Sequence, residues 1–355
     1  MEFKETLAKI TAEGASDIFI VAGRPLSYKL HGQIVDEGER LLPDDTQRLV
    51  NEIYLLARNR ELARLMEDGD DDFSFALPGV ARFRINAFKQ RGSLSAVIRV
   101  IKFSIPKPED LGIPETIINF ADKKKGFVLI TGPAGSGKST TLACMIDHIN
   151  NTRPGHIITL EDPIEYLHQH KKCIVSQREI ITDSDSYLTA LRASLRQSPD
   201  VILLGEMRDY ETMNVAMTAA ETGHLVLSTL HTIGASNTID RIIDAFPPSQ
   251  QHQIATQLSM VLQAVVSQQL VPTVDGSIVP AFEVMTLTPA IRNMIRESKI
   301  HQIDGMIASS AENNMIAMDT SLMNLLKAGR ITAKTALSFA TNPELMEKKI
   351  NLLGR

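Results

Sequence analysis

The chain has 355 residues and a formal net charge of −5, with acidic and basic residues mixed along it. This length is enough for two or three domains, and the acidic balance argues against a broad nucleic-acid-binding surface. Its two cysteines, Cys144 and Cys173, lie far apart, which excludes a disulfide framework and a zinc module of paired cysteines. No apolar run approaches the ~18 residues of a membrane span and no signal peptide opens the sequence, so we expect a cytoplasmic protein.

Residues 1–105 predict an α+β domain without a phosphate loop. We expect an opening helix, strands over 17–21 and 26–35, a helical pair over 44–66, and strands over 72–77, 81–90 and 95–101. In the strand over 81–90, Phe83 and Ile85 face one way while Arg82 and Arg84 face the other. These arginines either cover a solvated sheet face or point at a bound phosphate.

A proline-rich segment over 104–114 separates this domain from the rest of the chain. It holds three prolines in eleven residues, which is typical of a semi-rigid linker. We therefore predict a linker over 106–114 and a second domain over 115–355.

The second domain opens with a strand, a glycine-rich loop and a helix. Phe127 to Thr131 form a short apolar run typical of a buried strand, and a helical pattern begins at Lys138. The intervening G-x-x-x-x-G-K-[ST] pattern presents backbone N–H groups to phosphate, a lysine to the β- and γ-phosphates and a hydroxyl to Mg²⁺. We predict that ATP and Mg²⁺ bind here, with Ser139 on the metal. The loop residues are Gly132, Pro133, Ala134, Gly135, Ser136, Gly137, Lys138, Ser139 and Thr140.

Carboxylates end the next two predicted strands. The strand over 156–160 runs into Glu161, Asp162 and Glu165, where an α/β sheet places its ligands; a solvated acidic turn is the alternative. A third strand over 200–204 leads to Glu206, and Gly205 stands where many NTPases have an Mg²⁺-holding aspartate. Magnesium is then expected to rely on Ser139, water and the carboxylates of the 161–165 turn, Glu161 among them.

Two histidines bracket a fourth buried strand, which follows a helix over 210–221. His224 precedes the strand and His231 follows it. They either serve packing and hydrogen bonding or sense the γ-phosphate; a two-histidine metal site lacks a third ligand.

Four alternating strand and helix units predict an α/β fold with a mostly parallel sheet and helices on both faces. From 236 to 355 we expect a largely helical region. It includes a helix with Thr288 as N-cap and Pro289 as its first residue, and another over 319–326 that Gly329 ends.

Four motifs together resemble the secretion ATPase superfamily of hexameric motors, and most closely the PilT family of type IV pilus retraction ATPases. They are the Walker A loop at 132–140, the aspartate box at 158–165, the Walker B segment at 199–209 and the histidine box at 219–231. In this family the Walker B glycine is normal.

Two further features favour the retraction branch of the superfamily. Residues 290–297 (AIRNMIRE) resemble the signature of retraction ATPases, and the chain has no cysteine after Cys173, whereas extension and type II secretion ATPases commonly carry a four-cysteine zinc module. Ala134 replaces a usual threonine, and Ile18 follows Ser16 and Asp17 where a histidine is often found.

The resemblance implies a PAS-like N-terminal α+β domain and a RecA-like P-loop ATPase domain with a helical C-terminal region. It also implies roles for individual residues. Glu206 is expected to orient or deprotonate the attacking water, with Glu165 as the other candidate base, and His224 and His231 to report the loss of the γ-phosphate. Arg84 and Arg99 are the expected arginine fingers, with Arg82, Arg91, Arg192 and Arg196 as competitors.

The implied assembly is a homohexameric ring at the cytoplasmic face of the inner membrane, docked on a pilus platform protein, without nucleic acid. Its activity would be ATP-driven pilus retraction and twitching motility. Three alternatives remain: an extension or accessory retraction motor, a nucleic-acid motor with a RecA-like core, and a protein that binds ATP without hydrolysing it.

Overall fold

The computed structural model describes residues 3–30, 32–58, 60–101, 104–309 and 314–353. They fall into two compact units: Met1–Ser104 with Glu165–Leu167, and Ile105–Ile164 with His168–Arg355.

The described residues of the first unit form one six-stranded sheet that shares an apolar core with three helices. The strand order is β3-β2-β1-β6-β5-β4, and every neighbouring pair is antiparallel. Phe83 and Ile85 are buried in the core beneath α1 and α2, so the alternation predicted for this strand is confirmed. The elements are α1 (Phe3–Glu13), β1 (Asp17–Ile20), β2 (Pro25–Leu30), β3 (Gln33–Arg40), α2 (Pro43–Leu56), α3 (Ala63–Asp68), β4 (Asp70–Leu77), β5 (Ala81–Gln90) and β6 (Ser93–Ile101).

A seven-stranded sheet organises the second unit in the part of the chain that the structure describes. Its order is β13-β12-β7-β11-β10-β8-β9, and all neighbours are parallel except β12 and β13. The strands are β7 (Gly126–Thr131), β8 (Gly155–Glu161), β9 (Cys173–Glu179), β10 (Val201–Leu204), β11 (Leu225–Leu230), β12 (Leu262–Pro272) and β13 (Ile278–Thr286).

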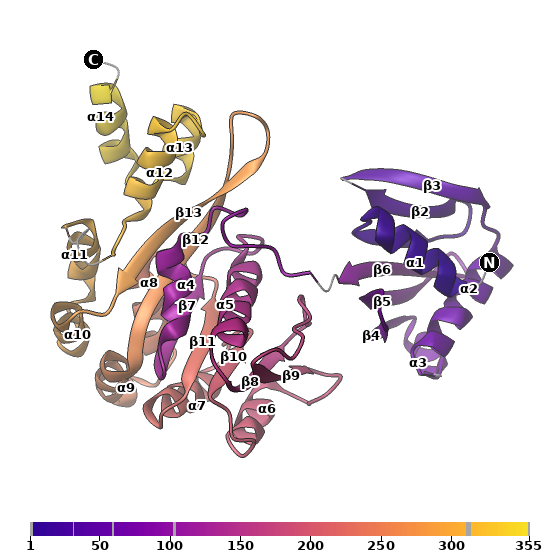
Figure 1. Ribbon diagram of the computed structural model, residues 1–355, viewed down its shortest axis with the longest axis horizontal. Coiled ribbons are helices and arrows are strands. Elements are labelled where there is room, and N and C mark those ends of the chain that lie inside the picture. Colours follow the sequence, from indigo (N-terminus) through magenta and orange to yellow (C-terminus); the bar gives the residue numbers. More distant parts are fainter. Residues whose placement is uncertain (1–2, 31, 59, 102–103, 310–313, 354–355) are drawn as a thin grey trace. The chain divides into compact units, whose positions relative to one another are not determined.

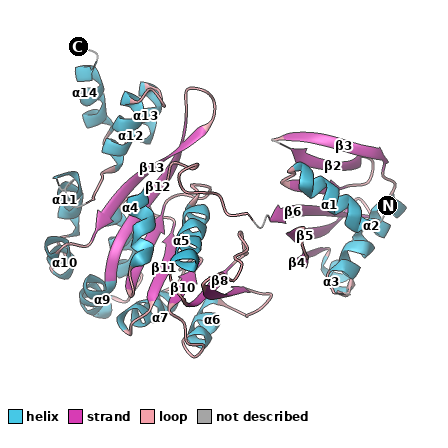
Figure 2. Cartoon of the chain, viewed as in Figure 1, coloured by secondary structure: helices cyan, strands magenta, loops and turns pink. Residues whose placement is uncertain are grey.

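Helices cover both faces of this sheet (Figures 1 and 2). One core joins α4, η1 and α5 to one face, and a second core packs helices α6 to α11 on the other. Because both faces are covered, β7, β10 and β11 are buried along their whole length. The helices are α4 (Glu115–Ile118), η1 (Asn119–Asp122), α5 (Lys138–Thr152), α6 (Tyr187–Ser194), α7 (Tyr210–Glu221), α8 (Ala235–Asp244), α9 (Pro248–Val261), α10 (Pro289–Arg296), η2 (Ile300–Gln302) and α11 (Ile303–Ser309).

Three last helices, α12 (Met318–Lys327), α13 (Ala333–Phe339) and α14 (Pro343–Leu353), pack on the distal part of the β12–β13 hairpin. Figure 1 shows them at the end of the sheet opposite to α9 and α7. Their shared core contains Val271 and Val279 from the hairpin and Leu322 from α12.

Most described residues after 236 are helical, as expected, but the sequence did not predict the β-hairpin that interrupts the helices. Strands β12 and β13 occupy 262–272 and 278–286, where an Asp275-Gly276 turn joins them. An Asp-Gly turn between apolar runs is a hairpin signal, and Val265 and Val266 have the β-branched side chains that strands favour. Strand β9 was also not expected. In the described residues, no helix is long and apolar enough to cross a membrane.

Candidate functional site

The glycine-rich loop joins β7 to α5 in a conformation that only glycine permits at its first residue. Gly132 has φ 141°, and a Cβ there would lie 2.1 Å from the Gln268 carbonyl oxygen. Gln268 lies on β12, and its side chain also accepts a hydrogen bond from Thr141 on α5 at 2.7 Å. Gln268 therefore packs against the first residue of the loop and against the helix that follows the loop. It was missed because its strand was missed.

Lys138 is at the start of α5 and only 8% exposed. Its ammonium donates to the carbonyl oxygens of Gly132 and Pro133, both at 2.9 Å. Ser139 and Thr140 follow in the first turn of the same helix. A glycine-rich loop, a lysine in its mouth and hydroxyls at a helix N-terminus fit a nucleotide triphosphate with its metal ion.

His231 brings this loop together with the Walker B glutamate. Strand β11 lies between β7 and β10, and His231 comes directly after it. The His231 ring places Nδ1 3.4 Å from Lys138 Nζ and Nε2 3.3 Å from Glu206 Oε1. The other carboxylate oxygen of Glu206 accepts from Arg208 at 3.0 Å. Glu206 and His231 also line a pocket of about 660 Å³.

The glycine of the Walker B segment has a steric cause in this fold. A Cβ on Gly205 would lie 2.9 Å from the Tyr187 hydroxyl and 3.1 Å from the Leu160 carbonyl oxygen. Burial raises the pKa of Tyr187 above its ordinary value, and the charges of Asp162, Glu206 and Glu161 add to this. An aspartate at 205 therefore has no room, and a neutral phenol fills that space.

The aspartate box ends β8 at the same edge of the sheet. Glu161 accepts hydrogen bonds from Thr159 at 2.6 Å and from Gln177 at 3.3 Å, which fix one oxygen of its carboxylate. The peptide bond between Asp162 and Pro163 is cis. Glu165 is exposed and belongs to the segment 165–167 of the first unit.

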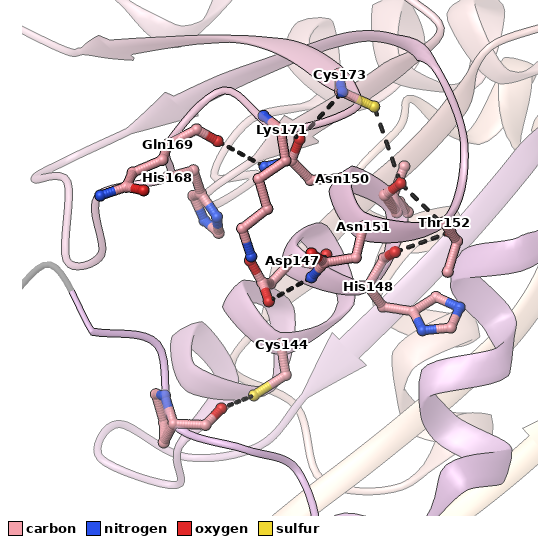
Figure 3. Close-up of polar contacts among 12 residues, drawn as sticks. Cys144, Asp147, His148, Asn150, Asn151, Thr152, His168, Gln169, Lys171 and Cys173 are labelled. Atoms are coloured by element: carbon pink, nitrogen blue, oxygen red, sulfur yellow. Dashed lines mark hydrogen bonds and ion pairs between the residues drawn. The ribbon is translucent and has the colours of Figure 1, made fainter.

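The chain after the aspartate box is fastened to the C-terminal half of α5 (Figure 3). The Asn150 side chain donates to the Gln169 carbonyl at 2.6 Å and accepts from the backbone amides of Lys171 and Cys173 at 3.2 and 3.1 Å. Lys171 also pairs with Asp147 at 2.7 Å. The helix that begins at Lys138 thus also holds the start of β9.

His224 does not join the cluster. It precedes β11, whereas His231 follows it, so six strand residues, roughly 20 Å, separate the two ends. The His224 ring lies 2.9 Å from the Ala219 carbonyl oxygen at the end of α7. Within this unit only His231 lies at the loop edge, and a role for His224 in sensing the γ-phosphate stays a prediction. In this chain the two rings lie too far apart to share one metal ion.

Arg84 and Arg99 lie opposite each other on β5 and β6 of the first unit. They line a hollow of about 210 Å³ together with Asp17 and Asp72, and Arg99 pairs with Asp17 at 3.2 Å. The structure therefore brings the two expected fingers to one face of this sheet. Arg82, one of the competitors, donates to Ser74 at 2.5 Å.

Comparison with known proteins agrees with these motifs. The model of the type II/IV secretion system protein family matches residues 2–325. The chain is 44% identical over 344 residues to the type IV pilus retraction ATPase PilT of Pseudomonas aeruginosa, covering 97% of this chain and 99% of the relative. It is 41% identical over 354 residues to the type IV pilus ATPase PilU of the same organism, covering 99% of this chain and 92% of the relative.

A crystal structure of the pilus retraction motor PilT with bound ADP matches this fold with a TM-score of 0.90 at 45% identity. The match covers 98% of this chain and 99% of the other. The chain therefore belongs to the type II/IV secretion system protein family and, within it, to the PilT family of pilus retraction ATPases.

Proposed function

We propose that this chain is an ATP-hydrolysing motor that drives type IV pilus retraction as a homohexamer. The observation that carries the proposal is the position of His231, which touches both the phosphate-loop Lys138 and the Walker B Glu206. Similarity to PilT over nearly the whole chain supports the biological role.

Lys138 and the loop amides hold the phosphates, and Ser139 and Glu161 serve the Mg²⁺. Phosphoryl transfer depends mainly on positioning and charge stabilisation, so one carboxylate must orient the attacking water. Glu206 takes this role because it lies at the same sheet edge as Lys138 and is only partly exposed. Glu165 is the second candidate. His231 senses the γ-phosphate, because its ring lies beside the lysine that would hold that group.

Loss of the γ-phosphate removes charge and hydrogen-bond acceptors beside Lys138, which is enough to bias a two-state arrangement. Arg84 and Arg99 act as fingers on the γ-phosphate, which makes hydrolysis depend on domain closure or assembly. Arg84→Ala and Arg99→Ala are expected to lower turnover while binding of fluorescent ATP persists. Unchanged turnover in both variants would remove them from the site.

In the cell, the ring docks at the cytoplasmic face of the inner membrane on a pilus platform protein. The test is complementation of a twitching-negative mutant that lacks its retraction ATPase, with the wild-type chain and with Glu206→Gln. Restored twitching by the wild type alone supports the proposal.

An accessory retraction motor is the second candidate, favoured by the similarity to PilU. The same complementation distinguishes the two, because an accessory motor restores movement only in cells that retain their main retraction ATPase.

A further inference from the structure

Two helices that lie far apart in the sequence begin without an N-cap side chain. Helix α8 has Gly234 at its N-cap position and α12 has Ala317, and neither residue offers a side-chain acceptor. The first N–H groups of a helix have no partner within the helix, so another group must accept them.

One buried carboxylate supplies the acceptors for both helices. Glu283 on β13 accepts from the Ala235 amide at 2.8 Å through Oε1 and from the Met318 amide at 3.5 Å through Oε2. Its directly opposed residue on β12, Ser267, accepts from the Gly234 amide at 3.0 Å. The negative charge thus faces the positive ends of two helix dipoles.

Burying the Glu283 carboxylate carries a desolvation cost. Glu283 is 7% exposed, and its burial raises the pKa of the carboxyl even though two backbone amides act to lower it. An apolar residue of similar size at a buried charged position is often neutral or stabilising. A role in positioning explains the carboxylate better than a contribution to stability does.

The loop that carries His231 is fastened to the capped start of α8. Thr232 shares a 2.7 Å hydrogen bond with Thr238, and the Ile233 carbonyl accepts from Asn237 at 2.8 Å. A shift of the first turn of α8 therefore shifts the residues that follow His231.

The start of α12 is in turn fastened to the helices beyond it. Asp319, the second residue of α12, accepts from the amides of Thr341 and Asn342, at 2.7 and 3.1 Å, just before α14. A continuous set of hydrogen bonds thus runs from the His231 loop through Glu283 to the last three helices.

We propose that Glu283 is a positioning residue that couples the His231 loop to the C-terminal helices α12 to α14. The functional half of this inference rests on the proposed role of His231 at the nucleotide. A displacement of the loop would move α12, and a partner that holds the C-terminal helices would bias the loop in return, since coupling between sites is reciprocal.

The test uses the full-length chain with Glu283→Met, which keeps the side-chain length and removes both acceptors. Amide hydrogen exchange is expected to quicken by roughly 10- to 100-fold at 232–238 and at 316–321 together, because each start loses a hydrogen bond to a charged group. ATP turnover is expected to fall several-fold in kcat, with KM for ATP within about twofold because the phosphate loop is untouched.

Two variants separate positioning from a general loss of packing. Ser321→Ala removes a neighbouring link, from the Phe282 amide to α12, and should leave exchange at 232–238 and kcat at wild-type values. Adding Ala317→Ser to Glu283→Met gives α12 its own cap and should restore protection at 316–321, but neither protection at 232–238 nor kcat.

Wild-type exchange at either helix start in a folded Glu283→Met protein would overturn the proposal, as would unchanged kcat alongside an active wild type. If Glu283→Met fails to fold, Ser267→Ala replaces it, and unchanged exchange at 232–238 in that variant would also overturn the proposal. The exchange measurement needs no turnover. A wild type without ATPase activity would refute the proposed function, whereas the exchange rates would still show whether Glu283 links the two helix starts.

Discussion

Replacing Gly205 by alanine tests why this Walker B segment carries no side chain before Glu206. The new Cβ would meet the Tyr187 hydroxyl at 2.9 Å and the Leu160 carbonyl oxygen at 3.1 Å. Overpacking of this kind costs about 1–3 kcal/mol. Where the end of β10 shifts to relieve the overlap, Glu206 shifts with it, and each ~1.4 kcal/mol lost from the transition state lowers kcat about tenfold.

The decisive comparison is Gly205→Ala in the wild type and in a Tyr187→Phe background. Removing the hydroxyl leaves the 3.1 Å contact as the nearest, so the double variant should recover about 1 kcal/mol of stability and part of the lost turnover. Urea unfolding and steady-state ATP turnover give both quantities. Gly305→Ala, whose Cβ would meet nothing within 4 Å, is the control and should keep full turnover. An equal loss from Gly205→Ala in both backgrounds would refute the steric argument.

In the phosphate loop, Gly132→Ala places a Cβ 2.1 Å from a backbone oxygen, whereas Gly135→Ala meets open space at φ 75°. For Gly135→Ala we expect about a tenfold or smaller loss of ATP affinity, because only the left-handed backbone disfavours alanine there. For Gly132→Ala we expect a loss of at least ~100-fold. Titrations with a fluorescent nucleotide measure both affinities, and equal losses would contradict this prediction. In the first unit, burial raises the pKa of Asp71, but hydrogen bonds from Arg60 and Tyr54 lower it by more, so it lies below its ordinary value of 3.8. The pair therefore stabilises the unit fully above that value, and the contribution disappears as the pH falls through the lowered pKa. Asp71→Asn should lower the free energy of unfolding by about 3 kcal/mol at pH 7, which is the low end for a buried pair because Arg60 is 35% exposed. An acid unfolding curve identical to that of the wild type would contradict this prediction.

Much of the fold follows from local patterns in the sequence. The alternation in 81–90, the apolar run before Gly132 and the cap of α10 all lie within a few residues of the features that they predict. Strand β12 was missed because its apolar residues run together with those of α9, without a glycine or proline to separate them.

The candidate site was only partly predictable. The groups proposed to act on the nucleotide lie in short motifs, so the sequence alone could name Lys138 and Glu206 as candidates. Their supports are not local: Gln268 reaches Thr141 across 127 residues, and Glu283 joins amides 48 and 35 residues away. The separation of His224 from the phosphate loop was not predictable for a different reason. Spacing shows that the two histidines bracket a strand. The two ends of a six-residue strand, however, lie at opposite ends of the sheet.

We propose above that this chain hydrolyses ATP as a ring through Glu206. The most direct test is ATP turnover of the purified protein and its Glu206→Gln variant, with particle mass measured by light scattering in the same samples. We expect hexamers in both samples, with nucleotide binding retained and turnover lost in the variant. A wild-type protein that binds ATP tightly without turnover, or a variant that hydrolyses at the wild-type rate, would contradict it.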